Sequence, residues 1–252
     1  MTRQRHSQTY RAASATTAIA AAALLVACGG AGGGGGSAGA AAPTSSTATF
    51  ALGSALAALV KDARTTTFNV SGTASKSGQT FAVTGNGTTS ESTVLGTFEG
   101  AAAYNKTTTV TGSLSAQGVS APLNSTGTAN YDLSFKPLGS ISANGYCVTS
   151  SYVALPTTAK VGDSGSWFEQ TCYSNSAKTT KLVTSTSSFQ IEPDTSSTAL
   201  WRVKTNVSAP TGASISSSTA YRITPSGALS FADSTSSGVV NGVTTSLVFT
   251  YP

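Results

Sequence analysis

Charge is scarce in this sequence. Only 9% of its residues are charged, against about 25% in a typical soluble domain, and Ser, Thr, Gly and Asn take their place. Such a surface is wet but uncharged, which is common in exported β proteins and unusual in cytosolic enzymes. The 14 basic residues form no cluster, so the sequence lacks the concentrated positive footprint of a nucleic-acid-binding protein.

Histidine is almost absent, because His6 is the only one in the chain. Serine nucleophiles of the protease type need a histidine base, and the usual zinc sites need His or several Cys. No Ser-x-x-Lys motif is present, and the nine acids are scattered without a pair fit for glycoside hydrolysis. We therefore expect no catalytic residue, no metal site and no cofactor, and we predict that the protein is not an enzyme.

The first 27 residues have the pattern of an export signal. Arg3, Arg5 and Arg11 precede an uncharged, alanine-rich run over residues 12–27. This run is about 16 residues long, short of the roughly 20 that a transmembrane helix needs. A membrane anchor helix and a buried core helix are the alternatives. Removing the signal discards His6 and three of the 14 basic residues, which leaves 11 against nine acids.

A short motif ends the apolar run. Leu25-Val26-Ala27-Cys28 is followed at once by two glycines. It resembles the lipobox that lipoprotein signal peptidase cleaves, with an aliphatic residue, two small residues and a cysteine. The resemblance implies that Cys28 becomes the N-terminus and carries a diacylglyceryl thioether and an N-acyl chain such as palmitate. Two or more acyl chains anchor a protein stably to a bilayer. The alternative is a small buried cysteine after an ordinary secretory signal.

Residues 28–49 are rich in Gly, Ala and Ser and contain no large apolar side chain. They are predicted to form a flexible tether with a reach of about 25 Å. In the lipoprotein family an Asp after the cysteine tends to retain the protein at the inner membrane. Gly29 occupies that place here, so the resemblance favours the outer membrane, facing the periplasm or the cell surface.

Two cysteines remain, Cys147 and Cys172. Because export places them in an oxidising compartment, we predict that they form a disulfide. Closing a loop of this length, 25 residues, stabilises a fold by roughly 3 kcal/mol. Two unpaired thiols are the alternative.

A helix is predicted over residues 50–63. Its apolar residues fall on one face at helical spacing: Leu52, Leu56, Leu59, Val60 and Ala63. Thr49 is the candidate N-cap, and Lys61 and Arg64 lie near the end, where cations suit the helix dipole.

After Arg64 the pattern becomes that of β-strands. Val70-Ser71-Gly72 recurs forty positions later as Val110-Thr111-Gly112, and Gly78 recurs as Gly118. We interpret the repeat as two similar hairpins in one antiparallel sheet; chance similarity between low-complexity segments is the alternative. Further strands are predicted at 146–155, 167–173 and 201–207 and in the last 32 residues, where Asn241-Gly242 is typical of a type I′ turn.

These elements predict one β-rich domain over residues 50–252. We expect a helix followed by about ten antiparallel strands in a curved sheet or a sandwich. The helix-first layout with a lipobox resembles LolA-like and LppX/LprG-like lipoproteins, which implies a curved sheet that holds acyl chains. The run LPTTAKVGDSG at 155–165 resembles one in periplasmic lipoproteins of unknown function.

Two further patterns suggest sites. Gly162-Asp163-Ser164-Gly165 resembles the nucleophile segment of chymotrypsin-like serine proteases, but without a histidine we interpret it as a turn. Glu192-Pro193-Asp194 is likewise interpreted as the start of a turn. Six aromatic residues either line a sugar-, peptide- or lipid-binding surface or pack in the core and rim: Tyr146, Tyr152, Trp167, Tyr173, Trp201 and Tyr221.

The sequence therefore predicts a membrane-anchored lipoprotein that acts as a structural or interaction module and meets a protein partner in the cell envelope. The alternative function is a carrier of an apolar or lipid ligand inside a curved sheet. A large apolar cavity would favour the carrier, and a filled core would favour the interaction module.

Overall fold

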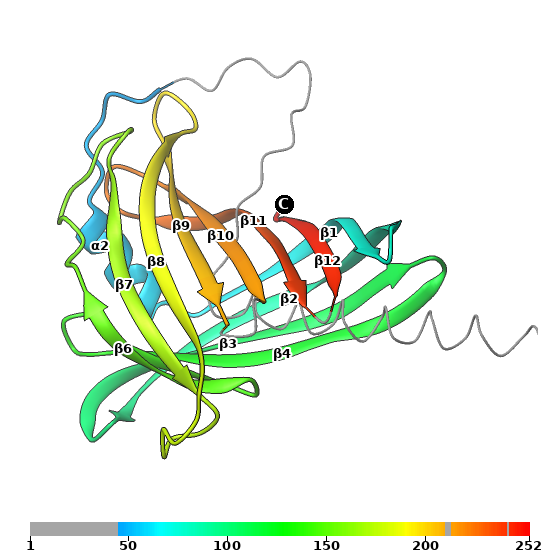
Figure 1. Ribbon diagram of the computed structural model, residues 1–252. Helices are drawn as coiled ribbons and strands as arrows, with labels where there is room; N and C mark the ends of the chain where they lie inside the picture. The colour runs from blue at the N-terminus through cyan, green and yellow to red at the C-terminus, as the bar shows by residue number, and fades with distance from the viewer. Residues whose placement is uncertain (1–44, 210–212, 241) are drawn as a thin grey trace, which may run out of the picture.

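A computed structural model describes residues 45–209, 213–240 and 242–252, and in these ranges one helix precedes twelve strands (Figure 1). The elements are α2 (Leu52–Lys61), β1 (Arg64–Lys76), β2 (Gln79–Phe98), β3 (Ala101–Ala116), β4 (Val119–Tyr131), β5 (Pro137–Ser142), β6 (Gly145–Tyr152), β7 (Ser164–Tyr173), β8 (Lys181–Pro193), β9 (Ala199–Ser208), β10 (Ser214–Ile223), β11 (Leu229–Val240) and β12 (Val243–Thr250). His6 and the whole lipobox, including Cys28, lie outside the described residues.

The strands form a closed antiparallel barrel. Each pairs with the next along the chain, and β1 also pairs with β12, where Val70 lies opposite Phe249. The mainly β fold is confirmed, but the open curved sheet or sandwich of about ten strands is wrong. Closure gives both end strands a partner and so removes the exposed sheet edges that an open sheet would leave.

Side chains alternate between an apolar interior and a polar exterior. In β9, Trp201, Val203 and Thr205 are buried inside the barrel, whereas Arg202 and Lys204 point outward. This confirms the strand predicted at 201–207. The outer face of β3 and β4 carries paired hydroxyls, as at Thr107 and Thr128, whose oxygens lie 3.0 Å apart. The outer face of these strands therefore has the polarity that suits contact with water.

Helix α2 packs inside one end of the barrel. Its buried side chains recur at helical spacing: Leu52, Ala55, Leu56, Leu59 and Val60. The predicted helix is confirmed, but Thr49 does not cap it, because Ala51 precedes the first turn and no side chain caps it. Instead the Gly53 N–H donates to the carbonyl of Thr157 at 2.9 Å. No helix in the described ranges is long and apolar enough to cross a bilayer.

The barrel wall supplies partners for the last helical carbonyls. The Arg64 guanidinium donates to the Ala58 oxygen, and the Thr93 hydroxyl donates to the Val60 oxygen, both at 2.6 Å. Terminal carbonyls of a buried helix otherwise lack partners. These bonds connect the end of the helix to β1 and β2.

The two repeated segments form similar hairpins, as predicted. Ser77 and Gly78 connect β1 to β2 with φ of 50° and 79°, and Gln117 and Gly118 connect β3 to β4 with φ of 51° and 75°. Positive φ at both turn positions matches the twist of the flanking strands. The hairpin between β11 and β12 also forms, although Asn241 of its predicted turn lies outside the described residues.

The interior contains two apolar clusters. The first surrounds α2 and includes Trp167, Ile191 and Trp201. The second fills the opposite part of the barrel, around Phe68 and Leu247. Glycine makes room there, since a Cβ at position 87 would lie 2.6 Å from the ring of Phe68.

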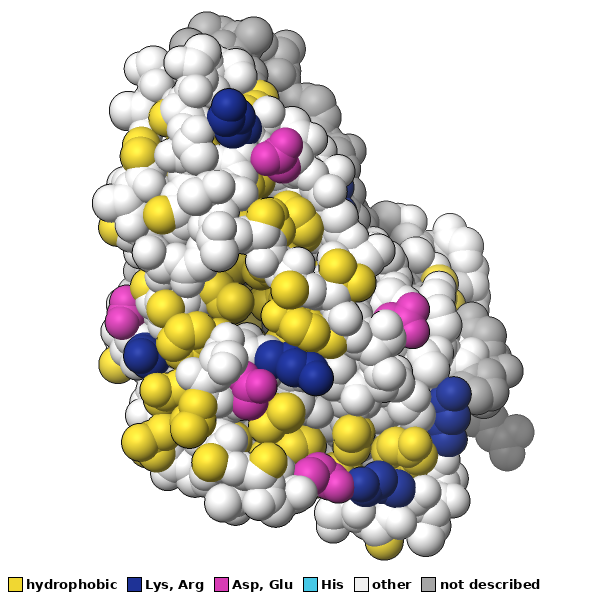
Figure 2. All heavy atoms as spheres, turned by 90° about the vertical axis from the view of Figure 1, so that its left-hand side faces the viewer, with side chains coloured by type: hydrophobic (Ala, Val, Ile, Leu, Met, Phe, Trp, Pro, Cys, Tyr) yellow, Lys and Arg dark blue, Asp and Glu magenta, His cyan; other side chains and the backbone are white. Residues whose placement is uncertain are grey.

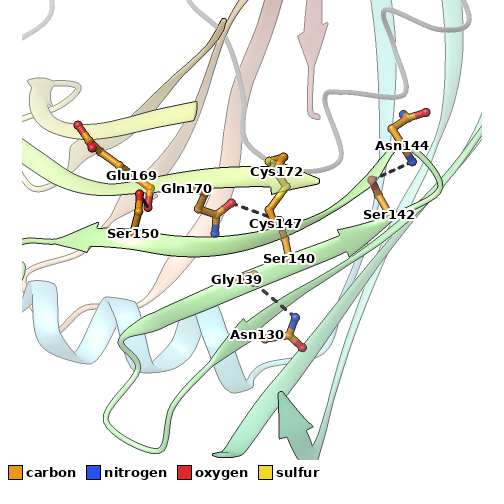
Figure 3. The surroundings of a disulfide bond; sticks show 10 residues. All are labelled: Asn130, Gly139, Ser140, Ser142, Asn144, Cys147, Ser150, Glu169, Gln170 and Cys172. Carbon is orange, nitrogen blue, oxygen red and sulfur yellow. Dashed lines mark hydrogen bonds between the residues drawn. A yellow bond between two sulfur atoms is a disulfide. The ribbon is translucent and has the colours of Figure 1, made fainter. Parts of the chain in front are cut away.

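Cys147 and Cys172 form the predicted disulfide (Figure 3). They lie directly opposite each other on β6 and β7. The bond joins two neighbouring strands of the barrel wall next to the interior.

Candidate functional site in the barrel interior

A cavity of about 150 Å³ lies between the two apolar clusters. The order of residues along the strands shows its place. On β3, Leu114 belongs to the second cluster, Thr108 and Lys106 line the cavity, and Tyr104 packs against the first cluster. The cavity therefore crosses the middle of the barrel, with the helix on one side of it.

Strand irregularities give the cavity part of its lining. The pairing of β7 with β8 shifts between Ser166 and Phe168, and both Trp167 and Phe168 line the cavity. The pairing of β4 with β5 shifts at Asn130 and Tyr131, which also line it. A regular strand would turn one residue of each pair outward, whereas bulges redirect side chains and are frequent beside functional sites.

Aromatic rings form one wall of the cavity. The ring centroids of Trp201 and Tyr221 are 6.0 Å apart, those of Tyr221 and Phe231 are 5.2 Å apart, and those of Phe231 and Tyr251 are 4.8 Å apart. These residues lie on β9, β10 and β11 and directly after β12. Neighbouring strands thus present a row of rings, of which Tyr221, Phe231 and Tyr251 line the cavity, and the row extends through Trp201 to Trp167 at 6.1 Å. Hydroxyl groups of the same strands also line the cavity: Thr205, Thr219 and Ser234.

The opposite wall, on β2 and β3, carries an ionic cluster. The Lys106 ammonium donates to Glu91 Oε2 at 2.8 Å, and the Arg64 guanidinium donates to the same oxygen at 3.1 Å. The side chains of Glu91 and Lys106 are only 5% and 6% exposed. Burial of charge is costly unless the charges are paired, so this cluster restricts where the three side chains can lie.

Neutral polar groups continue this wall on β4, β5 and β7. The Ser140 hydroxyl donates to Gln170 Oε1 at 3.2 Å, and the Asn130 amide makes a long contact of 3.5 Å with the Gly139 carbonyl (Figure 3). A Cβ at Gly139 would lie 2.2 Å from the Cys147 carbonyl oxygen. Only glycine therefore fits between these strands.

Burial changes the acid–base properties of the lining. It lowers the pKa of Lys106 below its ordinary value, although Glu91 partly opposes the change. It raises the pKa of Tyr221 well above the ordinary value and that of Tyr251 to about 12. Both phenols are therefore neutral at physiological pH.

One buried donor in the cavity wall lacks a partner. Trp167 is 2% exposed and lines the cavity, and its indole Nε1 has no hydrogen-bond partner in the described part of the chain. A buried N–H without a partner costs about 1–3 kcal/mol. Trp201 Nε1 likewise has no partner among the described residues, and both indole nitrogens have practically no accessible surface.

The structure brings together three of the six aromatic residues that the sequence singled out. Trp167, Trp201 and Tyr221 lie in the interior. Tyr146 instead donates to Glu99 at 2.5 Å in an exposed contact. Tyr152 is only partly buried and packs against the first apolar cluster, with the Lys136 ammonium 5.5 Å from its ring centroid. Tyr173 lies opposite Tyr146 on the neighbouring strand.

The protease-like segment is only partly a turn. Gly162 and Asp163 turn the chain, and Asp163 Oδ2 accepts from the Lys160 N–H at 2.7 Å. Ser164 and Gly165 already belong to β7, so the turn predicted over four residues is too long. The prediction at Glu192-Pro193-Asp194 is also corrected, because Glu192 and Pro193 are paired within β8.

Sequence reasoning missed the ionic cluster. Scattered acids and lysines normally face solvent, and nothing local distinguishes Glu91 or Lys106. The available signal was the period-two alternation of side chains along a strand. Glu91 is an even number of residues from buried Val83, and Lys106 is an even number from buried Leu114. Both charged side chains therefore share the inward face of their strands.

The arrangement can hold a small ring-shaped molecule between an aromatic and a polar wall. No family model matches the chain, and neither a curated protein nor a solved structure is significantly similar to it. Within the described ranges, no three His, Cys, Asp or Glu side chains converge on a possible metal position. The chemistry of the cavity is therefore the basis for assigning a function.

Proposed function

We propose that this chain is a non-enzymatic lipoprotein of the cell envelope whose barrel binds a small ligand in its interior. The main support for this proposal is the cavity between the two apolar clusters, with a buried Glu91–Lys106 pair on one side and aromatic rings on the other. Functional pockets combine apolar surface with a few polar groups that fix orientation.

The size of the cavity argues against the lipid carrier. An apolar cavity of about 150 Å³ holds a molecule such as benzene. A long acyl chain needs much more room, and the charged wall would oppose it. The proposed ligand is therefore smaller and more polar than the carrier hypothesis assumed.

Ligand-observed NMR tests this function. A library of small ring compounds is screened against the complete mature protein and against a variant that fills the cavity, Thr108→Phe. Thr109→Phe is the matched control, because it places the same ring on the outer face of the same strand. Ligands should bind the wild type and the control and lose binding to Thr108→Phe. Equal binding to all three, or no binding at all, contradicts an interior site.

Anchoring is tested separately. The lipobox supports acylation at Cys28 and export to the outer membrane, and the disulfide and the polar outer face of β3 and β4 suit an aqueous, oxidising compartment. Cys28→Ser should abolish palmitate incorporation and leave unprocessed precursor. Palmitate labelling that persists in Cys28→Ser argues against the anchor.

Exposed apolar side chains favour a protein-binding role as the second candidate. Leu95 and Val94, consecutive residues of β2 whose side chains face opposite sides of the strand, are 70% and 62% exposed. Hydrophobic side chains also gather around a hollow on the face drawn in Figure 2. A photo-crosslinking residue at position 95 should capture an envelope protein in living cells, whereas one at position 109 should not. Equal labelling, or none, at the two positions contradicts this role.

A further inference from the structure

The size and flanks of the cavity restrict the ligand class, given that the barrel binds a ligand as proposed above. A volume of about 150 Å³ accommodates one six-membered ring. The rings that line the cavity come from β10, β11 and the residue after β12, and the polar groups on β4 and β5 lie on the opposite side of the closed barrel from β10 and β11. A ring held between them would have one apolar face against the aromatic residues and polar substituents toward the other wall.

The polar wall offers both donors and acceptors. Lys106 gives one hydrogen bond, to Glu91, among the described residues, which leaves two of its three N–H groups for a ligand. Glu91 adds a carboxylate, and Thr108 adds a hydroxyl that can donate and accept. Hydroxyl groups, which also donate and accept, match such a mixed wall best.

The charges at the cavity balance one another. Glu91 and Lys106 are the two charged residues that line the cavity, and they form one ion pair at 2.8 Å. Arg64 donates to the same carboxylate from outside the lining and also lies 3.6 Å from the exposed Asp62. An ionic ligand would therefore introduce an uncompensated buried charge, which is costly, whereas an uncharged one would not.

The aromatic wall suits the C–H face of a saturated ring. Tyr221, Phe231 and Tyr251 form a continuous surface with centroid separations of 5.2 and 4.8 Å. The Tyr221 phenol is neutral at physiological pH and can donate to a ligand oxygen. From volume, charge balance and the two walls, we infer that the cavity binds one uncharged pyranose ring, either a free monosaccharide or the terminal residue of a glycan.

The chain provides its own reporter for this ligand. Its only two tryptophans are Trp167 and Trp201, both in the first apolar cluster. Trp167 lines the cavity, and the Trp201 ring lies 6.1 Å from it. The complete mature protein is titrated with glucose, galactose, mannose and N-acetylglucosamine. The detergent used carries no sugar headgroup. Mannitol tests for an open chain, cyclohexanol for an apolar ring and benzoate for an anion. Tryptophan emission and saturation-transfer NMR are recorded in parallel.

At least one pyranose should bind saturably and more tightly than mannitol, cyclohexanol and benzoate. Tyr221→Phe, which removes one hydroxyl, should weaken binding by about tenfold. Tyr146→Phe is the matched control and should leave the dissociation constant unchanged, because this phenol lies outside the barrel. Methyl glycosides and disaccharides that bind as well as the free sugar identify a terminal glycan residue. Their failure to bind identifies a free monosaccharide.

The outcomes separate this inference from the proposed function. Binding of cyclohexanol or benzoate without any pyranose overturns the sugar assignment and leaves an interior binding site in place. Pyranose binding that is equally weakened in Tyr146→Phe and Tyr221→Phe overturns the cavity as its location. If no ring compound binds, both the sugar assignment and the interior site fail.

Discussion

The buried ionic cluster makes a quantitative prediction about stability. Glu91 Oε2 is the shared acceptor of Lys106 and Arg64, at 2.8 and 3.1 Å. Replacing Glu91 by leucine leaves two cations in the barrel without their common partner. Removing one member of a buried pair costs about 3–5 kcal/mol, because the remaining charge is uncompensated. We expect Glu91→Leu to lower the free energy of unfolding by that amount at pH 7.

Lys106→Met should be milder, because Glu91 keeps its bond to Arg64. The double variant should then be less destabilised than the sum of the two single variants, with a coupling of about 1–3 kcal/mol. The methionine side chain has a shape similar to that of the aliphatic part of Lys106, so the packing around it changes little. The double-mutant cycle thus separates the electrostatic contribution from the lost contacts.

The effect should depend on pH with a definite sign. Burial lowers the pKa of Lys106, so between the folded and unfolded pKa values the unfolded chain binds more protons than the folded protein. Stability therefore rises with pH across this window, up to the unfolded value of about 10.4. Without Glu91, which opposes the shift, the window widens. The difference between Glu91→Leu and the wild type should shrink as the pH rises from 7 toward 10.

Urea unfolding followed by circular dichroism at pH 7 and pH 9.5 measures these quantities. Taking the difference between variant and wild type cancels the tyrosine ionisations that both proteins share. A loss below about 1 kcal/mol, the size of an exposed ion pair, would refute the buried cluster. So would a loss that does not change between the two pH values.

Three further predictions follow from the fold. Replacing both Cys147 and Cys172 by serine should lower the free energy of unfolding by about 3 kcal/mol without changing the far-ultraviolet circular dichroism. A changed spectrum would contradict a barrel that forms without the disulfide. Burial raises the pKa of Tyr251 to about 12, and a raised pKa gives stability that is complete below the unfolded value of about 10 and lost toward 12. The wild type should therefore lose stability from pH 10 upward more steeply than Tyr251→Phe, and parallel curves would show a solvated phenol. Leu114→Ala should cost about 2–5 kcal/mol because the side chain is 3% exposed, whereas Val119→Ala on the next strand should cost under about 0.5 kcal/mol; equal losses would contradict the second apolar cluster.

Several features were determined by local sequence. Period-two alternation is enough to predict a strand such as the one at 201–207, because successive side chains face opposite sides. The glycines at 78 and 118 predicted the two similar hairpins, because their turns require positive φ. The disulfide followed from there being two cysteines left once Cys28 was assigned to lipid.

The tertiary structure alone decided the closure of the sheet. Pairing of β1 with β12 joins the two ends of the described chain, and no local pattern encodes a contact at that separation. Closure also determines where the helix lies. An amphipathic face at 50–63 indicates that the helix packs on something, but only the barrel shows that it packs inside one end.

The candidate site required the same long-range information. Glu91 and Lys106 belong to different strands, and their meeting depends on the register of β2 against β3 and on which face became the interior. A shift of either strand by one residue would turn the charged side chain of that strand to solvent. The sequence by itself determined the strands, the turns and the cysteine pair. The tertiary structure decided which side chains share an interior, because barrel closure is a property of the whole chain rather than of any segment.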